Sequence, residues 1–212
     1  KLIKMTINLN SVGMEKGRQY ETIITTKNSD NLSNAAPIGV LYAGNDKVLS
    51  RIFKGSHTLE NIIEQKEYIV NITHDPELFM LSTLGNLDED CFNEDNSLRD
   101  AEAYFKCKVI SLKEAVKQSD PIKKKDEAIV IKSEVTELVI NDSSKAYNRG
   151  FGYVVETLSN LSRFDLVDED QKQHYLDRFR EAKRIVNKVG YTQDIKAMNE
   201  IKKELVKKGY EP

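Results

Sequence analysis

The sequence has few of the residues that build metal centres or disulfide frameworks. It contains two cysteines, Cys91 and Cys107, without a CxxC pair, and three histidines far apart in the chain. Neither spacing matches that of a zinc site, so no metal site is expected. We interpret the two cysteines as reduced thiols of a cytoplasmic protein, with a disulfide or a metal-binding pair as the alternative.

Long apolar runs are also missing. No run approaches the roughly 18 residues that cross a bilayer, and no apolar signal segment follows the first residues KLIK. We therefore expect no membrane association. The 212 residues carry a net charge of −2, and residues 141–212 hold 14 basic and 12 acidic side chains. This balance gives no electrostatic reason to expect nucleic-acid binding.

Several catalytic and nucleotide-binding motifs are absent as well. The chain has no nucleophile elbow of a hydrolase, no GxGxxG fingerprint of a separate dinucleotide domain and no P-loop spacing. Five carboxylates fall within residues 88–95, but the segment lacks the glycine and the spacing of a calcium loop. We therefore expect a solvated loop there.

The apolar pattern divides the chain into two parts. Short β-branched runs between Asn, Gly and Asp turns continue to about residue 140, and a helical period of apolar residues follows from about 145. The sequence predicts an α+β, mainly β fold, with a β-barrel-like domain over 1–141 and about three helices packed on it over 142–212. The expected elements are strands at 20–26, 38–42, 48–53, 68–72, 101–112 and 128–140, short helices at 58–65 and 75–82, an exposed turn at the lysines 123–125, and long helices from about 152, 169 and 192.

The C-terminal helices carry their own signals. Val154, Leu158 and Leu161 define one inward-facing stripe on the first of them. Gly190 is expected to stop the second helix in a left-handed conformation. Thr192 is expected to cap the third.

A first polar cluster lies at the end of the first predicted strand and before the second. Hydroxyls and amides at a strand end can hydrogen-bond the polar edge of a ligand. Small side chains let a flat ring approach the backbone, and a proline fixes the entry to the next strand. An ordinary turn rich in Asn, Ser and Pro is the alternative. The residues concerned are Thr25, Thr26, Lys27, Asn28, Asn34, Ala35, Ala36 and Pro37.

A second polar cluster opens the short helix at 58–65. It consists of Lys54, Gly55, Ser56, His57 and Thr58. Glycine permits a tight backbone, while hydroxyls and N–H groups at a helix N-terminus attract an anion, which together predict a phosphate cradle. A capped helix with incidental basic neighbours is the alternative. Ser56 or His57 would then lie near the N-cap, and His57 would either contact a phosphate or lie on the surface.

The order of the two clusters resembles that of the DUF447 proteins, an archaeal-type family of unassigned function. The resemblance lies in ITTKN…NAAPIGV…RIFKGSHTLENI…EYIVNITHDPELF and, later, KAYNRGFGYVVETLSNLSRF, and it covers about residues 21–205. It implies the FMN-binding split barrel that flavin reductases share. It also implies a homodimer with one FMN at each subunit junction.

The resemblance implies roles for particular residues. The first cluster would line the flavin ring, and the second would hold the phosphate. Arg149, in the later motif, would either reach the ligand or only tie the helical region to the barrel. Asn61 and Asn71 also match the family motif, although their roles could be structural.

The implied function is that of an oxidoreductase of flavin reductase type. It would transfer hydride or electrons through FMN, from a reduced nicotinamide, NAD(P)H, or a deazaflavin donor to an acceptor. Flavin chemistry needs no protein nucleophile or base, so no side chain is expected to be catalytic. Lys27 and the backbone amides of Ala35 and Ala36 are candidates to stabilise the reduced ring at its N1/O2 edge. A non-enzymatic FMN carrier or sensor and a flavin-free interaction module are the alternatives.

Overall fold

The computed structural model describes residues 7–85, 87–115, 128–143 and 145–212. The chain divides into two compact units, one up to Tyr147 and one from Asn148 onward. The turn expected at the lysines 123–125 lies outside the described residues. Within the described ranges, no helix combines the length and the apolar character needed to cross a bilayer.

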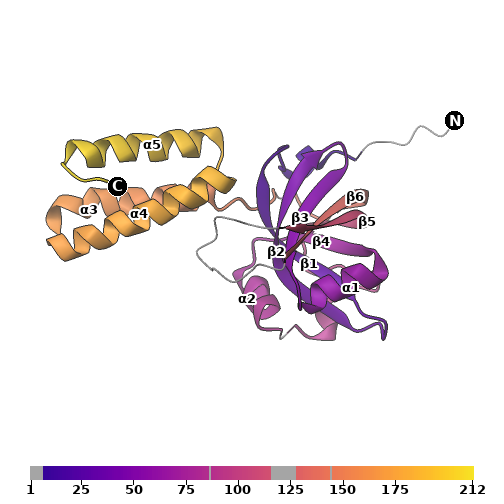
Figure 1. The fold of residues 1–212 in the computed structure, drawn as a ribbon. Helices are drawn as coiled ribbons and strands as arrows, with labels where there is room; N and C mark the ends of the chain where they lie inside the picture. Colours follow the sequence, from indigo (N-terminus) through magenta and orange to yellow (C-terminus); the bar gives the residue numbers. More distant parts are fainter. Residues whose placement is uncertain (1–6, 86, 116–127, 144) are drawn as a thin grey trace. The chain divides into compact units, whose positions relative to one another are not determined.

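The first unit is a closed barrel of six antiparallel strands in the order β1-β2-β3-β6-β5-β4 (Figure 1). Side chains that alternate along these strands, such as Tyr20, Val40 and Phe105, are completely buried and form its core. The predicted fold, mainly β with three C-terminal helices, is confirmed. The strands are β1 Gln19–Lys27, β2 Ser33–Gly44, β3 Lys47–Phe53, β4 Glu67–Ile72, β5 Ala103–Ala115 and β6 Ala128–Ile140.

Two short α-helices accompany the barrel. Ser56 is the N-cap of α1, and its hydroxyl accepts the N–H of Leu59 at 3.3 Å. Asp75 caps α2 with Pro76 as its first residue, as the Asp-Pro pair predicts. The helical segments of this unit are η1 Leu9–Val12, α1 His57–Gln65, α2 Pro76–Leu84 and η2 Glu89–Cys91.

The second strand begins earlier than its composition suggests. The sequence predicts a start at Ile38, but β2 begins at Ser33, so the small-residue segment 34–37 is strand. The N–H of Asn28 donates to the carbonyl of Leu32, so these two residues form a hydrogen-bonded pair. Hydrogen-bonded and non-hydrogen-bonded pairs alternate along the β1–β2 register, and this alternation places Pro37 at a non-hydrogen-bonded position. A proline is tolerated there because the ladder requires no N–H from it.

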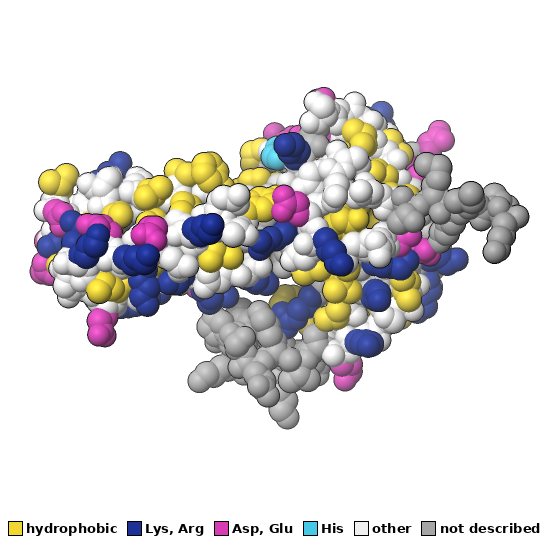
Figure 2. Space-filling model, turned by 90° about the horizontal axis from the view of Figure 1, so that it is seen from above, with side chains coloured by type: hydrophobic (Ala, Val, Ile, Leu, Met, Phe, Trp, Pro, Cys, Tyr) yellow, Lys and Arg dark blue, Asp and Glu magenta, His cyan; other side chains and the backbone are white. Residues whose placement is uncertain are grey.

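The second unit consists of three helices with a shared apolar core. Phe164, Phe179, Val186, Met198 and Leu205 are buried in it. Its visible face in Figure 2 carries acidic, basic and hydrophobic side chains interspersed, without a large area of one kind. The elements are α3 Gly150–Arg163, η3 Phe164–Leu166, α4 Glu169–Val189 and α5 Thr192–Lys207.

The structure corrects one residue of the α3 stripe. Val154 is buried and Leu161 packs against the core, but the Leu158 side chain is 46% exposed. Thr157 is buried in its place. The buried stripe follows a spacing of three and then four residues from Val154, which turns Leu158 away from the core.

The two helix-terminus predictions near residue 190 are wrong. Gly190 has φ −68° and ψ 156°, an extended rather than left-handed conformation. The requirement for glycine is steric, because a Cβ there would lie 2.7 Å from the carbonyl oxygen of Val186. Thr192 is the first residue of α5, and the N-cap is Tyr191, whose N–H donates to Asp194 Oδ2 at 2.8 Å.

Candidate functional site

The end of β1 places two consecutive threonines in different surroundings. Successive side chains of a strand point to opposite faces of the sheet. Thr25 Oγ1 donates to the carbonyl of Asn96 at 2.7 Å and accepts from Asn71 Nδ2 at 3.1 Å. Thr26 Oγ1 accepts from Asn61 Nδ2 at 3.0 Å, on the side where α1 lies. Both threonines are buried, so their hydroxyls serve as fixed links between segments.

A hydrogen-bonded group joins the two clusters that the sequence predicts separately. Asn34 Nδ2 donates to Thr58 Oγ1 at 3.0 Å and lies 3.5 Å from Thr26 Oγ1. Thr58 and Asn61, both on α1, are buried beside it. One residue from each of β1 and β2 is therefore fixed to the first turns of α1.

The remaining side chains of the second cluster are only partly available to a ligand. The Ser56 hydroxyl, besides capping α1, donates to a backbone carbonyl at 2.9 Å. Lys54 pairs with Glu114 at 2.9 Å, and the His57 side chain is 88% exposed. Gly55 has φ 78°, and a Cβ there would meet nothing within 4 Å, so open space adjoins this turn.

The backbone amides of Ala35 and Ala36 differ in direction. The register pairs Ala36 with Ile24 at a hydrogen-bonded position, so its N–H belongs to the β1–β2 ladder. Ala35 occupies the alternate position, and its N–H points away from β1. The described pairing of β2 with β3 extends only from Val40 to Gly44, so no paired β3 residue lies opposite Ala35. Of the two candidate amides, only that of Ala35 points to the side of β2 that faces away from β1, where no β3 residue pairs with it.

Asn28 and Arg149 have other surroundings. The side-chain oxygen of Asn28 accepts the N–H groups of Asp30 and Leu32, which closes the β1–β2 turn. Arg149 belongs to the second unit and immediately precedes α3. Together with a hydrogen bond from Arg184, its positive charge lowers the pKa of Glu181. Arg149 thus takes part in the electrostatics of the helical unit.

A cavity of about 480 Å³ lies beside the ends of β1 and β4. The predicted residues Thr25, Thr26, Lys27 and Asn28 line it, whereas residues 34–37 and 54–58 do not. The first cluster therefore adjoins two places, the cavity and the hydrogen-bonded group at α1. The other lining residues include Glu67, Tyr68, Ile69, Asp95, Asn96, Lys106 and Lys108.

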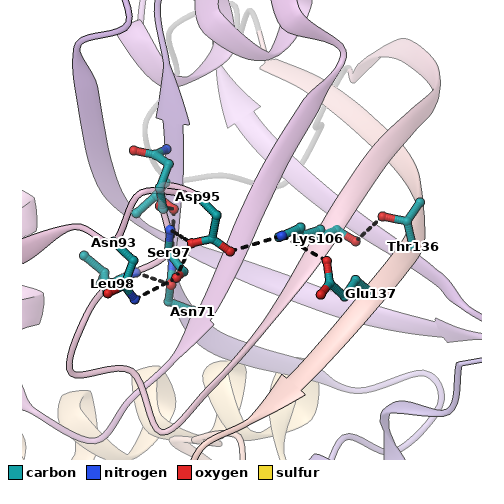
Figure 3. A network of polar contacts seen from close by, with 10 residues as sticks. Asn71, Asn93, Asp95, Ser97, Leu98, Lys106, Thr136 and Glu137 are labelled. Atoms are coloured by element: carbon teal, nitrogen blue, oxygen red, sulfur yellow. Dashed lines mark hydrogen bonds and ion pairs between the residues drawn. The ribbon is translucent and has the colours of Figure 1, made fainter.

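Asp95 and Asn96 contribute to the cavity wall, and the segment 93–98 that carries them is anchored to β5 (Figure 3). Asp95 accepts hydrogen bonds from the N–H and hydroxyl of Ser97 and lies 3.1 Å from Lys106 Nζ. Lys106 also pairs with Glu137 at 2.9 Å. Burial disfavours the Asp95 carboxylate, but the hydrogen bonds from Ser97 and Lys106 outweigh it and lower its pKa to about 2. The five carboxylates of residues 88–95 are all exposed, as expected of a solvated loop, and Asp95 is in addition held by Ser97 and Lys106.

Asn71 and Asn96 complete the attachment of this wall. Asn71 is completely buried, donates to the carbonyl of Ile23 and accepts the N–H of Leu98 at 2.8 Å. Asn96 has φ 71°, a left-handed conformation that Asn tolerates better than most residues. The role of Asn96 was missed from sequence, where only the Asn-rich composition of the loop could have indicated it.

The two cysteines are both free thiols. Cys107 is buried, and burial raises the pKa of its thiol. Among the described residues, no group of His, Cys, Asp and Glu has the arrangement of a metal site.

Comparison with known proteins places both units in one family. The model described as "Protein of unknown function (DUF447) N-terminal domain" matches residues 20–142. The companion model, "Protein of unknown function (DUF447)", matches residues 148–203. An uncharacterized protein of Methanocaldococcus jannaschii is 30% identical over 174 residues, which are 80% of this chain and 89% of that protein.

Solved structures are also similar. An FMN-bound DUF447 protein from Methanosarcina mazei is 28% identical with a TM-score of 0.54, over 92% of this chain and 99% of its own. The flavin reductase of styrene monooxygenase from Pseudomonas putida matches 61% of this chain and 89% of its own, at 11% identity and a TM-score of 0.48. The family resemblance and the split-barrel fold that it implies are confirmed by the family models and the Methanosarcina structure.

Proposed function

This chain belongs to the DUF447 family, and from that premise we propose that it binds FMN and acts as an oxidoreductase of flavin reductase type. The FMN-bound relative from Methanosarcina mazei supports the cofactor, because the likeness extends over nearly the whole of both chains. The observation that carries the proposal is the hydrogen bond from Asn34 to Thr58, since it fixes the expected ring and phosphate clusters to each other.

The phosphate would bind at the start of α1. The first N–H groups of an α-helix have no intrahelical acceptor, so those of His57 and Thr58 can face an anion. The tight turn at Gly55 leaves space beside them, and Lys54 adds a positive charge nearby. Ser56 would contribute indirectly, because its hydroxyl holds the helix N-terminus in shape.

The flavin ring would lie along the end of β1 and the facing edge of β2. Thr25, Thr26 and Asn28 would shape this part of the site. Lys27 and the N–H of Ala35 would favour negative charge at the N1/O2 edge of the ring. When bound, FMN supplies hydride or electron transfer, and the protein binds, orients and polarises it. No side chain is assigned a catalytic role.

We further propose the larger arrangement that the family implies. The barrel domain, 1–141, would bind FMN at the junction of a homodimer, and residues 142–212 would form the second domain. NAD(P)H or a deazaflavin would be the electron donor. Sedimentation should then give a dimer for the FMN-loaded protein, and a stable FMN-loaded monomer would contradict a shared site.

An absorbance spectrum of the purified full-length protein tests the cofactor directly. We expect a yellow protein whose flavin is released on denaturation and identified by mass as FMN. NAD(P)H and a reduced deazaflavin should then be oxidised in air at a rate proportional to protein. FMN binding without turnover of either donor would indicate a carrier or sensor. Failure to bind added FMN would indicate a flavin-free interaction module.

A further inference from the structure

We propose that the outer face of α3 is a self-association surface, which packs against the same face of α3 in a second copy of the chain. The face is an apolar stripe formed by Phe151, Val155 and Leu158, whose side chains are 46% to 66% exposed. Their spacing of four and then three residues places them on one side of the helix, over consecutive turns. Single exposed apolar residues are ordinary, but a contiguous stripe indicates a contact surface.

The other two helices of this unit do not present such a face. Within the described residues, α4 exposes no large hydrophobic side chain and α5 exposes only Val206. Their outer faces carry ion pairs instead, such as Arg184 with Glu181 on α4 and Lys203 with Glu200 on α5. A charged outer face is usual for a helix that meets only water. The stripe is therefore a local exception within the helical unit.

The charges of α3 favour a second copy as the partner. The helix has 14 residues, and its only charged side chains are Glu156 and Arg163. At 3.6 residues per turn, both lie more than about 100° around the helix from the centre of the stripe, and Glu156 is paired with Arg178 at 2.7 Å. Two copies of the stripe therefore meet without opposing charges. A strongly charged partner surface would instead lose water without gaining an ion pair.

The shape of the stripe is also self-complementary in an antiparallel pair. When two α3 helices cross at Val155, residues at equal distances on either side of it lie at the same level. Phe151 would then lie level with Ser159 of the partner subunit, and Leu158 level with Gly152 of the partner subunit. A two-fold axis through Val155 generates both contacts in both copies. Bulky side chains thus meet small ones, which allows the close approach of packed helices.

The size of α3 limits what this contact does alone. The helix is about 21 Å long, and its three exposed apolar side chains are far fewer than the roughly 20–30 residues that each partner contributes to a standard interface. The contact would therefore add to the larger junction of the FMN-binding homodimer, so its role rests on the proposed function.

Disulfide cross-linking of the full-length protein tests the surface. A two-fold axis through residue 155 brings that position next to its own copy, within the short Cβ–Cβ distance that a disulfide requires. We expect Val155→Cys, in a Cys91→Ser background, to give a covalent dimer under mild oxidation, while the buried Cys107 stays unreactive. Lys203→Cys, at an exposed position of α5 in the same background, is the matched control and should remain a monomer on a denaturing gel.

A charge placed in the stripe should weaken the dimer. Leu158→Glu would bury a carboxylate in the contact, and we expect it to raise the dissociation constant of the FMN-loaded dimer about tenfold or more, as measured by sedimentation. Asn199→Glu adds the same charge at an exposed position of α5 and should leave that constant unchanged. If the protein binds no FMN but its apo dimer shows this pattern, the surface stands and the proposed function fails.

Three results would overturn the inference. Position 155 would give no covalent dimer, or position 203 would cross-link to the same extent. Alternatively, the FMN-loaded dimer would form with the same dissociation constant in the wild type and Leu158→Glu. That last result would leave the proposed function in place and assign the stripe to another part of the same chain or to a different protein.

Discussion

Asn34 Nδ2 donates a hydrogen bond to Thr58 Oγ1 at 3.0 Å and thereby ties β2 to the first turn of α1. Thr58 is buried, and Asn34 also approaches Thr26 at 3.5 Å. A ligand that touches the β1–β2 end and the α1 N-terminus would meet one connected surface. The relative placement of the two ends is therefore set by a few short contacts rather than by a flexible linker.

Replacing the charge and the cap at the α1 turn should weaken FMN binding. Ser56→Ala would remove the N-cap and cost about 1 kcal/mol of stability, so Ser56→Gly, which costs only a few tenths, is the better partner for Lys54→Ala. The double variant should lose about ten- to a hundred-fold in FMN affinity, as expected for a charge-assisted contact. Flavin fluorescence titration measures it. Lys132→Ala, which changes an exposed lysine of β6, is the control and should keep the FMN affinity of the wild type. Unchanged FMN affinity in the double variant would exclude the phosphate assignment.

Truncating Asn71 should destabilise the barrel. The side chain is completely buried and makes three hydrogen bonds, to Ile23, Thr25 and Leu98. Asn71→Ala removes all three bonds and should lower the free energy of unfolding by about 2–4 kcal/mol. Denaturant unfolding gives the value. Asn93→Ala, which removes one partly buried bond to Ser97, should cost about 1 kcal/mol or less. Equal losses in the two variants would contradict the anchoring role.

Asp95 should make stability depend on pH in the acid range. Its pKa in the folded protein is about 2, below its value of about 4 in the unfolded chain. Ionised Asp95 therefore stabilises the fold above pH 4, and this contribution is lost as the pH falls from about 4 to 2. The side chain is 32% exposed, so solvent screening limits the effect to about 1 kcal/mol. Denaturant unfolding of wild type and Asp95→Asn should show a difference that shrinks over this interval. A constant difference would refute the assignment.

Substitution by asparagine distinguishes the two possible reasons for a glycine at 190. A left-handed helix stop accepts Asn, whereas a steric requirement does not. A Cβ at position 190 would lie 2.7 Å from the carbonyl oxygen of Val186, so Gly190→Asn should cost about 2–3 kcal/mol. Gly209, at φ 89° with open space around it, is the matched site, and Gly209→Asn should cost about 1 kcal/mol or less. Thermal unfolding of the full chain compares them. A tolerated Gly190→Asn would argue against the packing explanation.

Local chemistry accounts for the parts of the fold that the sequence predicts well. α2 starts at the Asp75-Pro76 pair, as predicted, because capping depends only on neighbours within one turn. β6 runs from Ala128 to Ile140 as predicted, since apolar alternation is a property of the segment itself. The same locality explains the error at β2. Asn, Ala and Pro at 34–37 resemble a turn, and only pairing with β1 makes them strand.

By itself, the sequence determined the element types, the two-part organisation and the residues of the two polar clusters. Each depends on periodicity or on a short motif. Tertiary structure alone decided that Thr25 bonds to Asn96, 71 residues away, and that Asn71 holds Leu98, 27 residues away. Such contacts depend on barrel closure and loop position, which no local pattern encodes. The same closure decided that the end of β1 both lines a cavity and is bonded to α1 through Thr26.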